Sequence, residues 1–122
     1  MTQKLTILTD VSLITCIVQR GRADDVVQAA QNAGAQGATI YYGYGSGVRE
    51  RLGILGLAID VEKEIITTLV ADDQVDRIFE RMYFAAGLDV PGAGLIYVTQ
   101  LEKAATYIPP DVVERLAKTV ES

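Results

Sequence analysis

The stretch GATIYYGYGSGVRERLGILGLAIDVEKE, residues 37–64, decides the fold, because a strand runs there into a glycine-rich excursion. Thr39 to Tyr42 are β-branched or aromatic and predict a strand, whereas the glycines that follow at every second position interrupt any regular face. We therefore expect a strand over residues 38–42 and a long loop over about residues 44–64.

The glycines of this excursion, Gly43, Gly45 and Gly47, allow two interpretations. Glycine accepts positive φ, so consecutive N–H groups can converge on an anion such as phosphate, and Arg49 would add positive charge. Alternatively, the glycines are only a flexible root for the loop. The spacing matches neither G-x-x-x-x-G-K-[ST] nor the Rossmann fingerprint, which needs a helix directly afterwards. We therefore disfavour an ATPase.

One order of elements occurs on both sides of this excursion. In each half, a short apolar run predicts a buried strand, two aspartates favour a helix N-terminus, and a glycine follows the amphipathic helix. A second strand completes each half. The predicted elements are strands at 13–18, 38–42, 65–70 and from Leu95 onward, and helices at about 24–33 and 72–86.

This duplicated β-α-β unit predicts an α+β, ferredoxin-like fold: a four-stranded antiparallel sheet with both helices on one face. Residues 1–122 form a single domain, with a short lead-in strand within residues 1–10. The tail is expected to form a short C-terminal helix over about residues 110–121, because Val113, Leu116 and Val120 have helical spacing. The uncovered face of the sheet would expose apolar residues, so we expect an oligomer. These residues are Leu13, Ile17, Ile65 and Leu69 or their alternating neighbours.

Composition excludes several classes of function. The chain has no histidine, which argues against zinc sites, other metal sites and Ser-His-Asp catalysis, and a net charge of −5 argues against nucleic-acid binding. Cys16 lies within an apolar run and is interpreted as a packing residue, and Glu62 and Glu64 as exposed charges. No apolar run approaches the roughly 18 residues of a membrane span, and no signal peptide is recognised, so we expect a cytoplasmic protein.

The order β-α-β, long loop, β-α-β, together with GATIYYGYGSG, the EKE at 62–64 and PGAG at 91–94, resembles the PII signal-transduction proteins, and more narrowly their PII-like branch. The resemblance covers roughly residues 11–105. It implies a regulatory homotrimer, not an enzyme, that binds an adenine nucleotide (AMP, ADP, ATP or cyclic AMP) in clefts between subunits. The long loop would engage a target such as a membrane transporter or an enzyme. The ligand-binding residues implied are Gly37, Thr39, Gly43, Gly45, Gly47, Arg49, Gly92 and Gly94.

The sequence also departs from this pattern. A phosphate-contacting lysine of the family corresponds to Leu95, its carboxylate partner to Thr67, and two arginines to Thr106 and Ile108. Each missing cation removes a contact of about 1.5 to 3 kcal/mol, which disfavours a tight ATP site of the usual type. A ligand with less charge than ATP would suit the site that remains, which consists of backbone N–H groups of the glycines and Arg49.

The loop carries the apolar run LGILGLAI at residues 52–59. This run either packs back onto the protein's own assembly or forms a tip that binds a partner. The residues of such a tip would be Arg51, Leu52, Ile54, Leu55 and Leu57. The alternative to a nucleotide sensor is a CutA-like structural trimer, or a small-anion sensor that binds no nucleotide. A small enzyme is disfavoured because no nucleophile and base are assembled.

Overall fold

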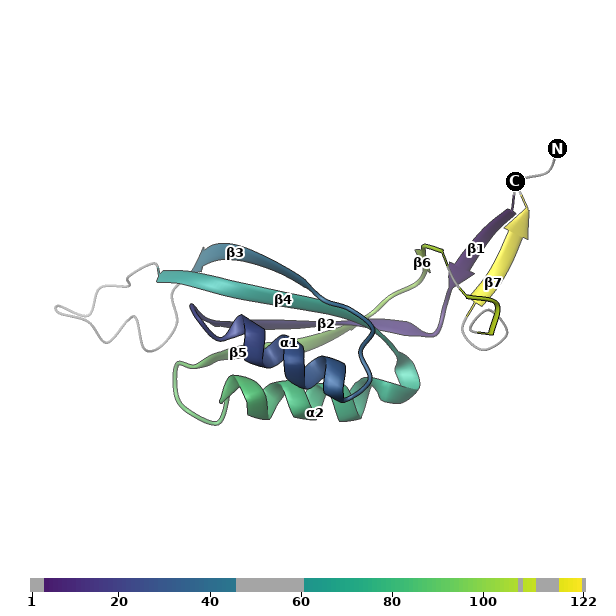
Figure 1. The fold of residues 1–122 in the computed structure, drawn as a ribbon. Helices are drawn as coiled ribbons and strands as arrows, with labels where there is room; N and C mark the ends of the chain where they lie inside the picture. The colour runs from purple at the N-terminus through teal and green to yellow at the C-terminus, as the bar shows by residue number, and fades with distance from the viewer. Residues whose placement is uncertain (1–3, 46–60, 108, 112–116, 122) are drawn as a thin grey trace.

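The computed structural model describes residues 4–45, 61–107, 109–111 and 117–121. Strands and helices are interspersed along the chain (Figure 1). They are β1 (Lys4–Leu8), β2 (Val11–Gln19), α1 (Ala23–Asn32), β3 (Thr39–Gly45), β4 (Val61–Ala71), the short 3-10 helix η3 (Asp72–Gln74), α2 (Val75–Ala86), β5 (Gly94–Gln100), β6 (Ala104–Ala105) and β7 (Ala117–Glu121).

The main sheet has four antiparallel strands in the order β3-β4-β2-β5, and both long helices lie on one of its faces (Figure 1). β2 pairs with β4 along its whole length, from Val11 opposite Ala71 to Gln19 opposite Lys63. β3 and β5 form the two edges of this sheet. The predicted ferredoxin-like arrangement is therefore confirmed.

The core lies between the sheet and the two helices. Alternate residues of β2, namely Ile14, Cys16 and Val18, are fully buried against the apolar stripes of the helices, which include Ile78 and Met82. Burying a large aliphatic side chain contributes roughly 1.5–3 kcal/mol, so this layer is the main source of stability. Cys16 has the packing role that the sequence predicts.

Arginines and a glycine complete the helix ends. The Nε–H of Arg77 on α2 donates to the carbonyl of Ala33, 2.9 Å away, at the end of α1. Gly87 ends α2 in the left-handed region at φ 66, as predicted, and the guanidinium of Arg22 lies near it. A positive charge at a helix C-terminus is favourable because the last carbonyls carry partial negative charge.

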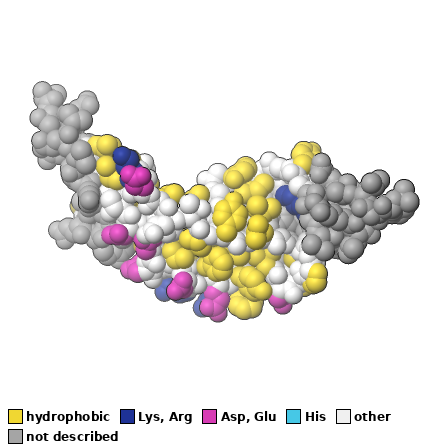
Figure 2. Space-filling model, turned by 180° about the vertical axis from the view of Figure 1, so that it is seen from behind, with side chains coloured by type: hydrophobic (Ala, Val, Ile, Leu, Met, Phe, Trp, Pro, Cys, Tyr) yellow, Lys and Arg dark blue, Asp and Glu magenta, His cyan; other side chains and the backbone are white. Residues whose placement is uncertain are grey.

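The open face of the main sheet carries the side chains that alternate with the core. One cross-strand row consists of Tyr41, Ile65, Ile17 and Leu95, taken from β3, β4, β2 and β5 in turn. Tyr41 is 49% exposed and Leu95 58% exposed. Seen from behind, hydrophobic side chains gather in the middle of the molecule (Figure 2). A single chain thus exposes apolar surface on this face, mainly on the edge strands. Of the residues predicted to be exposed there, Ile65 is only 9% exposed, and Leu13, Ile17 and Leu69 are half-buried.

Two strands of the main sheet are longer than predicted. β3 continues to Gly45, and β4 begins at Val61 instead of at Ile65, so the segment between them is residues 46–60 instead of about 44–64. The reason is that β2 and β3 offer partners to the extra residues of β4: Lys63 pairs with both Gln19 and Gly43. The EKE segment therefore belongs to the sheet.

A second, three-stranded sheet has the order β6-β1-β7. Its strand β7 corrects the last part of the helix predicted over 110–121, because residues 117–121 pair antiparallel with Lys4–Leu8, whereas Pro110 and Asp111 are helical. The available edge of β1 outweighs a helical spacing that only three apolar residues support. Residues 112–116 lie outside the described residues. Within the described part of the chain, no helix is long and apolar enough to cross a membrane.

Candidate functional site

The glycines predicted to bind ligand form two groups at the same end of the main sheet. Gly43 and Gly45 lie at the end of edge strand β3, whereas Gly92 and Gly94 lie in the turn before, and at the start of, the other edge strand, β5. Two strands separate these edges, which corresponds to roughly 14 Å at the usual strand spacing. One chain therefore does not bring the two glycine groups together.

Gly37 and Thr39 lie at the opposite end of β3, beside a cavity of about 860 Å³. The side-chain hydroxyl of Thr68 donates to the carbonyl oxygen of Gly37 at 2.5 Å, which fixes the backbone at this edge of the cavity. Thr39 and Gly43 are four residues apart on one strand, or roughly 13 Å, and share the open face. The predicted residues on β3 thus follow a single line along its open face.

The cavity is lined mainly by uncharged groups from distant parts of the chain. Thr67 and Leu69 come from β4, Gln74 from η3, and Thr106 and Asp111 from the C-terminal segment. Asp111 is the only charged residue among the described residues that line it. This lining suits an uncharged group that makes hydrogen bonds, and its described residues offer no cation to a phosphate.

The glycines differ in what a side chain would meet. A Cβ atom at Gly45 would lie 3.8 Å from Lys63 Cγ, an ordinary contact, and one at Gly43 would lie 3.3 Å from Ile65 Cδ1. At Gly94, however, it would lie only 2.1 Å from the carbonyl oxygen of Ile17. The close pairing of β5 with β2 therefore requires Gly94, independently of any ligand.

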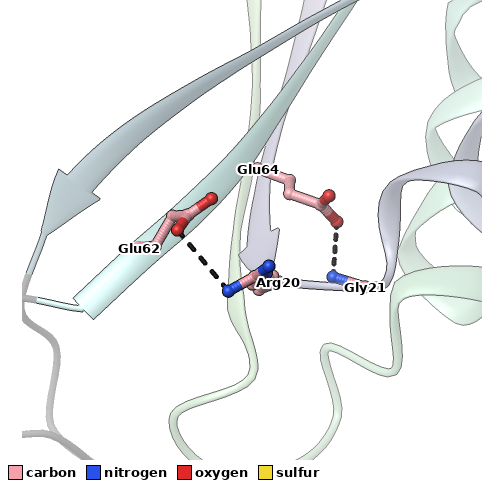
Figure 3. Close-up of polar contacts among 4 residues, drawn as sticks. All are labelled: Arg20, Gly21, Glu62 and Glu64. Atoms are coloured by element: carbon pink, nitrogen blue, oxygen red, sulfur yellow. Dashed lines mark hydrogen bonds and ion pairs between the residues drawn. The ribbon is translucent and has the colours of Figure 1, made fainter.

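Glu64 lies next to the Gly43 end of the sheet, and its role was not predicted from the sequence. Its side chain is not an exposed charge: the residue is 9% exposed, and Oε1 accepts hydrogen bonds from three consecutive backbone N–H groups at the start of α1. Figure 3 shows the first of these hydrogen bonds, from Gly21. The donors are Gly21 at 2.7 Å, Arg22 at 2.9 Å and Ala23 at 3.0 Å. The signal was present in the alternation of β4, where Glu64 shares the covered face with Ile66.

Two further contacts surround this turn. Glu62 is partly exposed, as predicted, and pairs with Arg20 at 3.8 Å (Figure 3). The side-chain amide of Gln19 donates to the carbonyl of Gly92 at 2.9 Å. The turn between β2 and α1 therefore contacts both the start of β4 and the glycine turn before β5.

Several predicted residues lie outside the described part of the chain, namely Gly47, Arg49, Arg51, Leu52, Ile54, Leu55 and Leu57. Among the positions that depart from the family pattern, Leu95 is exposed on the open face, and Thr67 and Thr106 line the cavity.

In the described ranges, no group of three or more His, Cys, Asp or Glu residues could hold a metal ion. Burial raises the pKa of the Cys16 thiol to about 12, so this residue is a poor nucleophile.

Comparisons with known proteins agree with this architecture. The sequence pattern of the family described as "Nitrogen regulatory protein P-II" matches residues 11–109. Among solved structures, that of Arabidopsis thaliana PII bound to citrate is similar with a TM-score of 0.61 and 22% sequence identity, over 77% of this chain and 79% of that chain. At this identity, the structural likeness concerns the fold alone. A search of curated proteins found no match. Because the family pattern spans most of the sequence, this chain belongs to the P-II family of nitrogen regulatory proteins.

Proposed function

We propose that this protein is a PII-like regulator that binds an adenine nucleotide between the subunits of a homotrimer. The observation that carries the proposal is the position of the two glycine groups at one end of the sheet but on opposite edges. A ligand that touches both groups needs the β3 edge of one chain beside the β5 edge of another. A head-to-tail contact of this kind, repeated around a rotation axis, closes into a ring.

The open face of β3 offers two different environments to one ligand. The cavity beside Thr39 has an almost uncharged lining, which suits a nucleobase and its ribose. Roughly 13 Å further along the strand, Gly43 and Gly45 leave the backbone accessible, which suits phosphate groups. The order along the strand is that of base, sugar and phosphate in an extended nucleotide. AMP, ADP, ATP and cyclic AMP are the candidates.

The apolar row on the open face supports assembly. Tyr41 and Leu95 stand at its two ends and are about half exposed in the single chain, so contact with neighbouring copies would remove apolar surface from water. Three copies are proposed because the resemblance to PII proteins implies a trimer.

The regulated partner would be a membrane transporter or an enzyme, reached through the segment between β3 and β4. Residues 51–57 of that segment carry the arginine and apolar residues proposed for this contact. In this proposal the protein acts as a sensor without catalysis, since PII proteins are regulatory. The alternative is a CutA-like structural trimer or a small-anion sensor. The shortage of cations among the described residues around the cavity favours the structural trimer of these two.

The deciding experiment is titration calorimetry of the full-length protein with ATP, ADP, AMP and cyclic AMP, with the mass measured by light scattering. Saturable binding near one ligand per subunit on a trimer supports the proposal. A trimer that binds none of the four contradicts the nucleotide part and leaves the structural alternative.

A matched pair of variants tests the position of the site. Thr39→Val removes a hydroxyl beside the cavity while preserving the shape of the side chain, and we expect an affinity loss of roughly fivefold to tenfold. Thr6→Val makes the same change on strand β1 of the second sheet, outside the cavity lining and both edges of the main sheet, and should have no effect. Equal affinities for both variants and the unmodified protein would mean that the base does not bind beside Thr39.

A further inference from the structure

Glu64 supplies a negative charge to the N-terminus of α1 from a different element, β4. Arg22, the residue at the N-cap position, makes no capping hydrogen bond with its own side chain. Gly21 has φ 94, and this left-handed conformation followed by a right-handed one turns successive N–H groups toward a common point. Glu64 Oε1 occupies that point and accepts all three hydrogen bonds at 2.7–3.0 Å. The carboxylate thus fills a backbone anion site with a group of the chain itself.

The same turn also holds the glycine turn before β5. Gln19, at the end of β2, donates from its side-chain amide to the carbonyl of Gly92 at 2.9 Å. The backbone carbonyl of Gln19 accepts from the N–H of Arg22 at 3.3 Å, so Gln19 and the anion site belong to one short segment. A continuous series of contacts therefore runs from Glu64 through residues 19–22 to Gly92.

We propose that Glu64 is a positioning residue for the ligand site: its carboxylate fixes the turn between β2 and α1, and Gln19 passes that position on to the Gly92 turn. The ligand part of this inference rests on the function proposed above. Glu64 itself does not contact the ligand, because its side chain lies on the helix-covered face, whereas Gly43 lies on the open face. Its effect on binding is indirect.

A simpler role, that of a helix cap alone, makes a different prediction. A cap stabilises α1 and nothing else, so its loss would loosen residues 21–24 and leave the Gly92 turn unchanged. A positioning residue affects both segments. Local hydrogen exchange distinguishes these roles without any ligand.

The first experiment measures hydrogen exchange by mass spectrometry on the full-length protein without ligand. Glu64→Gln keeps the shape of the side chain but removes its charge, and Glu102→Gln, at an exposed glutamate beyond the far end of β5, is the control. We expect roughly tenfold faster exchange in peptides covering 19–24 and 90–96 for Glu64→Gln, and no change for the control. Faster exchange in residues 19–24 alone would overturn the proposal.

Chemical rescue tests the anion site directly. Glu64→Ala leaves space where the carboxylate was, and formate has the same charged group. Added sodium formate should restore slow exchange in both peptides, whereas sodium chloride at equal ionic strength should not. Should Glu64→Ala fail to fold, the Glu64→Gln comparison still decides the question. Failure of formate to slow exchange in a folded Glu64→Ala protein would count against an anion site.

The ligand arm uses calorimetry with ATP, ADP, AMP and cyclic AMP on the unmodified protein, Glu64→Gln, Gln19→Ala and the double variant. If Glu64 acts through Gln19, each single variant loses roughly tenfold in affinity and the double variant loses little more. Additive losses would overturn the series of contacts. Should the unmodified protein bind none of these nucleotides, the proposed function fails, while the exchange experiments still decide the role of Glu64.

Discussion

Replacing Gly94 with alanine should destabilise the folded protein far more than an ordinary surface substitution. The new Cβ atom would lie 2.1 Å from the carbonyl oxygen of Ile17 and 3.1 Å from Leu88 Cδ2. Carbon–oxygen contacts between strands are normally about 3.3 Å, so β5 must retreat from β2 by about 1 Å. That movement strains the pairing of Gly94 with Val18, and the φ of 153 adds backbone strain for any residue with a side chain. We expect a loss of about 2–4 kcal/mol in the free energy of unfolding.

The assay is guanidinium chloride unfolding of the full-length protein followed by far-UV circular dichroism. Gly45→Ala is the matched control, because its Cβ atom would make only an ordinary 3.8 Å contact with Lys63. The control should change the free energy of unfolding by no more than about 0.5 kcal/mol. If Gly94→Ala unfolds at the same denaturant concentration as Gly45→Ala, then strand pairing does not require a glycine at position 94.

Three further substitutions test other features. Gly87→Ala should lower the free energy of unfolding by about 1 kcal/mol, measured by the same assay, because Gly87 ends α2 at φ 66; an unchanged midpoint would contradict this. Leu95→Glu places a charge in the apolar row of the open face and should shift the mass of the proposed trimer in light scattering toward that of a monomer; an unchanged mass would exclude Leu95 from the interface. Burial raises the pKa of Cys16 from 9.0 to about 12, so its contribution to stability is complete below pH 9 and is lost as the pH rises toward 12, by up to about 1.4 kcal/mol per pH unit. The Cys16→Ala variant should therefore lose stability less steeply between pH 9 and 11 than the unmodified protein, and equal slopes would refute the assignment.

The elements of the main sheet were predictable because their residue patterns repeat over many positions. Apolar runs such as residues 13–18 and 65–70 and the helical spacing from Val75 to Ala86 each rest on several residues, so no single exception changes the assignment. Gly87 indicated the end of α2 independently of the apolar pattern, because glycine favours the left-handed conformation at a helix C-terminus. The fold class followed from the order of these elements.

Features that depend on distant partners were not predictable in the same way. The C-terminal segment was expected to be helical, but Ala117–Glu121 pairs with Lys4–Leu8, which lies over 100 residues earlier in the chain. Glu64 was interpreted as exposed because the predicted strand began at Ile65, one residue too late to include it in the alternation. The two glycine groups were each recognised, whereas their separation on opposite edges follows from the strand order alone.

The strand order also has a consequence for biosynthesis. Both edges of the main sheet, β3 (TIYYGYG) and β5 (GLIYVTQ), lack charged residues and proline, which are the usual protection against unwanted strand addition. In the proposed assembly, a newly made chain therefore exposes two unprotected edge strands until other copies of the chain cover them. We expect its yield in soluble form to depend on how quickly sister chains meet, so that synthesis from neighbouring ribosomes on one messenger RNA favours correct assembly over aggregation.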